Sequence, residues 1–146
     1  MSEKEYPRKH TYPLLREGGR QKPRIPIRII NITTGKSEVT NALIDTGSDS
    51  CVFPSYITSS IGYELKEEDK RKFGIKGISG IEVESYVHGY KIELLDRDKR
   101  KTLASIDTIA YTVNTNNLTP LLGTNRFLMF FKITIDYNVG EITLEW

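Results

Sequence analysis

One acidic residue stands in a setting that could support acid–base chemistry. Asp45 follows the apolar run of residues 42–44 and is itself followed by Thr46, Gly47 and Ser48. Burying a carboxylate is costly unless it is hydrogen-bonded. Here the neighbouring hydroxyls and the Gly47 amide could bind it, because glycine lets backbone approach closely. We interpret this Asp-Thr-Gly as a site built to hold a charge.

Two further motifs follow the tripeptide. Residues 77–80, Gly-Ile-Ser-Gly, are typical of a tight hairpin tip, where glycines supply positive φ angles. Residues 121–125 read Leu-Leu-Gly-Thr-Asn. An isolated Asp-Thr-Gly could be a chance match in a turn, but the order of the three motifs resembles the retropepsins. These are the single-domain aspartic proteases of retroviruses and their cellular and prokaryotic relatives. The resemblance covers roughly residues 23–146.

The resemblance implies a role for individual residues. Asp45 would be the catalytic carboxylate, Thr46 would brace the active-site loop across a dimer, and the Gly47 backbone would bind substrate. The backbone of the glycine-rich tip, or flap, would hold a peptide, and apolar side chains would line its pockets. The expected substrate-binding residues are Leu43, Ser48, Asp49, Val52, Gly77, Ile78, Ser79 and Ile81.

Two positions depart from the retroviral pattern. Thr124 stands where an arginine usually pairs with the acid that corresponds to Asp49, so Arg126, Arg24 or Arg28 could take that role. Ser48 stands where many retroviral enzymes carry alanine. A hydroxyl that donates to a carboxylate stabilises its charged form, so we expect a more acidic activity optimum than with alanine at this position.

A single catalytic aspartate requires a second chain. Aspartic proteolysis uses two carboxylates that share a proton, because two close like charges cannot both ionise. The sequence contains Asp-Thr-Gly once, and Asp107-Thr108 is followed by Ile109 instead of glycine. We therefore expect an isologous homodimer with the site on its two-fold axis. Residues 142–146 are expected either to pair at that interface or to form an ordinary edge strand within one subunit.

The elements that must position the motifs are mostly strands. The expected class is all-β: a retropepsin-like acid protease barrel with a flap hairpin and one short C-terminal helix. Apolar alternation and turn residues predict the strands. The expected helix places Phe127, Phe130 and Phe131 on the core side. The expected elements are a hairpin over 25–44 turning at 33–36, a loop with a helical turn over 54–72, a long hairpin over 73–95, a charged turn at 96–101, a strand over 103–113, a helix over 125–131 and a strand pair over 133–144.

The front of the chain differs from the rest in charge. Its first 24 residues carry seven basic residues against three glutamates, within a chain of 146 residues and net charge +2. Proline, glycine and the absence of an apolar period predict a basic, flexible arm over residues 1–23 and a protease domain over 24–146. The sequence shows neither a signal peptide nor a membrane span, so we expect a cytoplasmic protein.

The remaining chemistry-bearing residues suggest no cofactor and no metal. Cys51 is the only cysteine, and His10 and His88 are isolated in the sequence, so each is expected to be a packed or surface residue. Our leading hypothesis is a homodimeric aspartic endopeptidase that acts on extended peptides or unfolded protein. The alternative is a catalytically weak retropepsin-like dimerisation or peptide-binding module. A small barrel that binds nucleic acid non-specifically through the arm is a third possibility.

Overall fold

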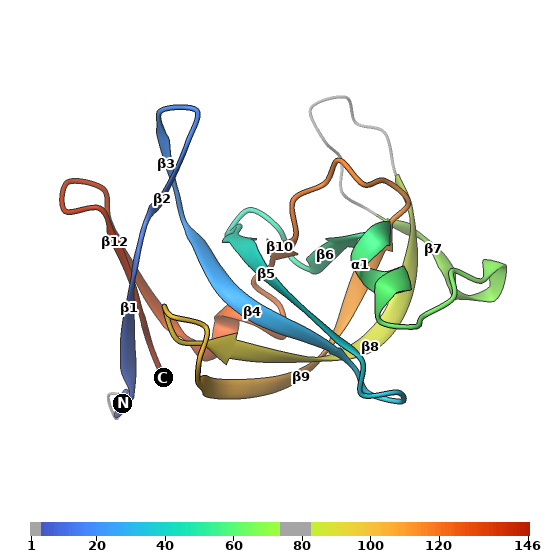
Figure 1. Cartoon of the computed structure of the whole chain (residues 1–146), viewed down its shortest axis with the longest axis horizontal. Helices are drawn as coiled ribbons and strands as arrows, with labels where there is room; N and C mark the ends of the chain where they lie inside the picture. The colour runs from blue at the N-terminus through green and yellow to red at the C-terminus, as the bar shows by residue number, and fades with distance from the viewer. Residues whose placement is uncertain (1–3, 74–82) are drawn as a thin grey trace.

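A sheet that closes on itself carries the loop after residue 44. In the computed structural model, which describes residues 4–73 and 83–146, the larger sheet has the order β4-β5-β10-β6-β9-β8-β7, and a further β4–β8 pairing closes it (Figure 1). The elements are β1 (Lys9–Pro13), β2 (Leu15–Glu17), β3 (Arg20–Lys22), β4 (Arg24–Asn31), β5 (Ser37–Ile44), β6 (Cys51–Pro54), α1 (Ser55–Ser60), η1 (Glu67–Asp69), β7 (Lys70–Phe73), β8 (Val83–Leu95), β9 (Thr102–Val113), β10 (Leu121–Leu122), η2 (Leu128–Phe130), β11 (Lys132–Asp136) and β12 (Glu141–Glu145).

The core lies inside this closed sheet. In β4, Ile25, Ile27 and Ile29 are fully buried, as the period-two alternation of a strand requires. The hairpin predicted over residues 25–44 is confirmed, since β4 pairs antiparallel with β5. The long β8–β9 pair forms much of the wall, and the charged turn predicted at 96–101 joins its two strands.

A second, three-stranded sheet has the order β1-β12-β11. The expectation of a flexible arm is wrong for residues 9–22. Lys9–Pro13 pair with β12, and the next residues form the β2–β3 hairpin. Tyr12 explains the packing of β1, because its ring is buried and its hydroxyl donates to the Leu95 carbonyl at 2.6 Å. Because β12 lies between β1 and β11, it is not an edge strand and has no free edge for a partner, so both alternatives expected for residues 142–146 are wrong.

The helix predicted over residues 125–131 is wrong. Residues 124–127 form a turn, and only the 3₁₀ helix η2 follows it. Arg126 has a φ of +65°, a left-handed conformation that stops an α-helix. Phe127 is buried as expected, but Phe130 is 44% exposed. The α-helix of the described residues is instead α1, which confirms the helical turn expected between residues 54 and 72.

No helix within residues 4–73 and 83–146 has the length and apolar character to cross a membrane.

Candidate active site

The loop that contains Asp45 emerges from a short crossing of three strands. Leu43 and Ile44 of β5 pair parallel with Leu121 and Leu122 of β10, which also pairs antiparallel with β6. β10 therefore lies between the strand that enters the loop and the strand that leaves it (Figure 1). The Asp45 N–H donates to the Leu122 carbonyl at 3.0 Å, which fixes the first residue of the loop to β10.

The Asp45 carboxylate is half-buried and accepts a backbone hydrogen bond. The Gly47 N–H donates to its Oδ1 at 3.0 Å, and the Ser48 N–H donates to the Asp45 carbonyl at 3.1 Å. A Cβ atom on Gly47 would lie 3.3 Å from the same carboxylate oxygen, so glycine suits this close approach. Thr46 and Gly47 are exposed. The loop thus orients one carboxylate and presents a threonine at the surface.

Gly123 packs directly against the backbone of Ser50, close to the Asp45 loop. The sequence analysis missed this role. A Cβ atom at this position would lie 2.3 Å from the Ser50 carbonyl oxygen, so only glycine fits. Directly after Gly123, the Thr124 N–H donates to the Ser48 carbonyl at 2.9 Å and the Asn125 N–H donates to the Asp49 carbonyl at 2.8 Å. The glycine of the Leu-Leu-Gly motif was the sequence signal for this contact. The sequence alone does not show that the backbone of Ser50 is the segment it contacts.

Ser48 does not make the contact that we expected. Its side chain is buried, and its hydroxyl donates to the Ser50 carbonyl at 2.8 Å. Among the described residues, the hydrogen-bond donor to the Asp45 side chain is the Gly47 amide. The hypothesis of a more acidic optimum caused by Ser48 therefore loses its geometric basis in this structure.

Asp49 is exposed, and within residues 4–73 and 83–146 it forms no ion pair. Two of the proposed arginine partners are engaged elsewhere. Arg24 bonds to Glu17, and Arg28 lies 3.0 Å from Glu93.

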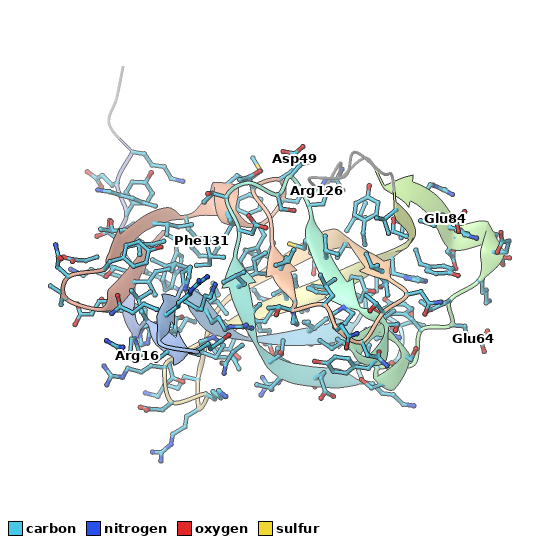
Figure 2. All side chains as sticks on the ribbon, turned by 90° about the horizontal axis from the view of Figure 1, so that it is seen from above. Arg16, Asp49, Glu64, Glu84, Arg126 and Phe131 are labelled. Carbon is cyan, nitrogen blue, oxygen red and sulfur yellow. The ribbon has the colours of Figure 1, made fainter. Side chains whose placement is uncertain are left out.

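Arg126 is exposed too, and its neighbour Asn125 is hydrogen-bonded to the Asp49 backbone. Figure 2 shows Asp49 and Arg126 at the same edge of the molecule, with Arg16 at the opposite edge. Arg126 is therefore the arginine of the three that lies near Asp49, without an ion pair between them in the described part of the chain.

The other predicted site residues divide into two groups. Leu43 is partly exposed near the loop, whereas Val52 is only 2% exposed and packs within the crossing of strands. The four flap residues Gly77, Ile78, Ser79 and Ile81 lie outside the described residues. The strands that precede and follow them in the chain are described: β7 pairs antiparallel with β8 from Lys70 to Phe73.

Cys51 follows the loop and is fully buried. Burial raises the pKa of its thiol to about 11, and a hydrogen bond from the Gly123 backbone lowers it by less. A thiol in this state is a poor nucleophile. Within residues 4–73 and 83–146, no three His, Cys, Asp or Glu side chains are grouped so that they could hold a metal ion.

Comparisons with known proteins identify the fold. No protein-family model matches the sequence, and no curated protein matches it. A retropepsin-like aspartic protease from Rickettsia conorii superposes with a TM-score of 0.58 at 12% identity, over 100% of this chain and 98% of that one. The EIAV protease complexed with the inhibitor HBY-793 is also similar, with a TM-score of 0.49 and 21% identity over 75% of this chain and 88% of that chain. The chain has a retropepsin-like fold.

Proposed function

We propose that this retropepsin-like chain is one half of a homodimeric aspartic endopeptidase. Each of two copies contributes one Asp45 carboxylate to a shared site, and the substrate is an extended or unfolded polypeptide. The observation that carries the proposal is the Asp45 carboxylate itself, which is oriented by the Gly47 amide at 3.0 Å on a loop fixed to β10.

Two carboxylates in one site can hydrolyse a peptide bond. One carboxylate takes a proton from a water molecule as the water oxygen attacks the peptide carbonyl carbon, and the other, protonated, gives its proton to the carbonyl oxygen. Collapse of the resulting diol breaks the C–N bond, and a proton passes to the leaving nitrogen. The proton that the two carboxylates share belongs to the pair rather than to either residue.

The exposed features of the loop support the need for a second copy. Thr46 and Gly47 lie at the surface next to the carboxylate, although Ile44 before the loop and Cys51 after it are buried. Within residues 4–73 and 83–146, the hydrogen-bond partner of this carboxylate is the Gly47 amide and not a second acid. Asp-Thr-Gly occurs once in the chain, so a symmetric copy is the simplest source of the second carboxylate.

The rim of the site favours an extended peptide. The partly exposed Leu43 offers apolar surface beside Asp45, and the exposed Asp49 carboxylate offers an acceptor for the N–H groups of a peptide backbone. The resemblance assigns the remaining contacts to the flap backbone at Ile78 and Ser79.

Cleavage of an unfolded protein by the purified chain, measured by mass spectrometry from acidic to neutral pH, tests the proposal. Asp45→Asn keeps the shape of the side chain but cannot act as base, so the cleavage rate should fall by at least about 10²–10⁴-fold. Asp98→Asn is the matched control, since it neutralises an exposed acid in the turn at residues 96–101 and should retain wild-type cleavage. Equal rates for wild type and Asp45→Asn would contradict the proposal. Peptide binding without cleavage at any pH would favour the catalytically weak module.

A further inference from the structure

Two segments, the end of the chain's basic front and the charged turn between β8 and β9, concentrate its positive charge. Residues 15–24 and 96–101 together hold eight basic side chains and three acidic ones, whereas the whole chain has a net charge of only +2. The basic residues are Arg16, Arg20, Lys22, Arg24, Arg97, Lys99, Arg100 and Lys101. The rest of the chain is therefore net negative.

The fold brings these two segments together, although more than 70 residues separate them in the sequence. A cleft of about 190 Å³ lies between them. Leu15 and Arg24 line it from the first segment, and Arg97 and Lys99 line it from the turn. The basic side chains of the two segments therefore belong to one surface.

Hydrogen bonds fix the turn in place. The Oδ1 atom of Asp96 accepts the N–H groups of Arg100 at 2.7 Å and Lys101 at 3.1 Å. The Arg97 N–H donates to His10 Nε2 at 3.0 Å, which ties the turn to β1. A folded turn thus presents these basic side chains, so a ligand that binds them has little backbone to order.

The hairpin on the other side of the cleft is fixed as well. β2 pairs antiparallel with β3, and Arg24 donates to Glu17 Oε2 at 2.8 Å, which joins β2 to the start of β4. Glu17 is the acidic residue of this segment. Because its carboxylate binds Arg24, it does not neutralise Arg16 or Arg20.

The other seven basic side chains form no ion pair within residues 4–73 and 83–146. Six of the seven are exposed and one is half-buried. We call them the basic surface: Arg16, Arg20, Lys22, Arg97, Lys99, Arg100 and Lys101. Uncompensated charge of one sign on one face attracts anions and raises their local concentration.

The chemistry of the basic surface favours a phosphate backbone over a protein or a membrane. The exposed large apolar residues of the described chain lie outside residues 15–24 and 96–101. Protein interfaces depend on a few apolar or aromatic anchors, and membrane-bound segments bury apolar side chains among the lipids. Four of the seven residues are arginines, whose planar guanidinium groups match the geometry of phosphate.

We propose that the basic surface binds the phosphate backbone of double-stranded DNA without reading its base sequence. Single strands are held by stacking on aromatic side chains, and duplex RNA is recognised partly through its 2′-hydroxyls. The basic surface instead consists of cations, which pair with the phosphates that a DNA duplex presents. This binding does not depend on the proposed peptidase, because Figure 2 shows Arg16 at the edge of the molecule opposite to Asp49 and Arg126.

Fluorescence anisotropy of the full-length chain with a labelled DNA duplex tests the proposal. If the surface neutralises about four to seven phosphates, the dissociation constant should rise about 10²- to 10⁴-fold between 50 and 200 mM salt. Duplexes of unrelated sequence should bind within about twofold of each other, because phosphate contacts carry no sequence information. Absent binding at 50 mM salt, or binding that does not respond to salt, would overturn the proposal.

One variant in each segment tests whether both contact the DNA. Arg20→Gln in the hairpin and Arg97→Gln in the turn each remove one phosphate contact. Each should raise the dissociation constant about 3- to 10-fold and reduce the salt slope by about one. Lys36→Gln is the matched control, since it removes the same charge from an exposed residue of the turn between β4 and β5 and should bind within about twofold of wild type. Circular dichroism checks folding, and Arg16→Gln and Lys99→Gln repeat the test if either variant fails to fold.

The remaining outcomes decide the partner and the extent of the surface. Weaker binding in both Arg20→Gln and Arg97→Gln, with Lys36→Gln unchanged, would support a surface shared by the two segments. An effect of only one of the two variants, or an equal effect of Lys36→Gln, would overturn it. Tighter binding of single-stranded DNA, duplex RNA, polyglutamate or phosphatidylserine vesicles at the same salt concentration would overturn the assignment to double-stranded DNA.

Discussion

Replacing Gly123 with alanine should separate the two backbone segments beneath the Asp45 loop. A Cβ atom at this position lies 2.3 Å from the carbonyl oxygen of Ser50 and 2.4 Å from its carbonyl carbon. Favourable carbon contacts begin at about 3.5 Å, so the segments must move apart by about 1 Å. Neither side can yield by rotating a side chain, because both are backbone.

The cost follows from what joins these segments. Two hydrogen bonds link them, from Thr124 to Ser48 at 2.9 Å and from Asn125 to Asp49 at 2.8 Å. Losing each costs about 0.5–1.5 kcal/mol, and overpacking costs about 1–3 kcal/mol. We therefore expect the free energy of unfolding to fall by about 2–6 kcal/mol. Peptide cleavage should fall as well, because the loop that orients Asp45 loses its support.

Urea unfolding followed by circular dichroism, at one fixed protein concentration, measures the effect. Gly89→Ala in β8 is the matched control. A Cβ atom there would meet only the flexible end of the Ile32 side chain at 3.4 Å, so the change should stay within about 1 kcal/mol. A Gly123→Ala variant as stable and as active as wild type would refute the close backbone contact.

Three further predictions concern residues outside the Asp45 loop. Thr58→Val removes a buried hydroxyl 2.6 Å from that of Thr112 and should lower the free energy of unfolding by about 1–3 kcal/mol, whereas exposed Ser60→Ala should change urea unfolding little. Burial lowers the pKa of His10 below 6.5, so its contribution to stability is present above pH 6.5 and is lost as the pH falls. In His10→Phe, the free energy of unfolding should therefore change less between neutral and acidic pH than in wild type. The Cys51 thiol, with a pKa of about 11, should react with iodoacetamide at neutral pH only as fast as the chain unfolds, and rapid labelling of the folded protein would contradict its burial.

The sequence was sufficient to place the catalytic candidate because the signals around it are local. Asp45 ends an apolar strand, and the alternation of Ile25, Ile27 and Ile29 defines the buried face of the strand paired with it. The glycines and charges of the turns at residues 33–36 and 96–101 act within a few positions of the chain. Local chemistry of this kind can be read without knowing which distant segments meet.

The errors arose where distant segments decide the structure. β1 contains one large buried residue, Tyr12, and its order depends on pairing with β12 about 130 residues later. The helix expected over residues 125–131 does not form because Arg126, which directly follows the residues hydrogen-bonded to the Asp45 loop, has a left-handed φ of +65°. The Ser48 hydroxyl is close in sequence to both the Asp45 carboxylate and the Ser50 carbonyl. The sequence could not show that it binds the Ser50 carbonyl.

Mixing wild-type chains with Asp45→Asn chains at constant total concentration is the most direct test of a site shared between two copies. If every active site needs both carboxylates and the copies exchange freely, activity follows the square of the wild-type fraction. An equal mixture should then retain about one quarter of the wild-type activity. About one half would mean that each chain acts alone, and would contradict the shared Asp45 site.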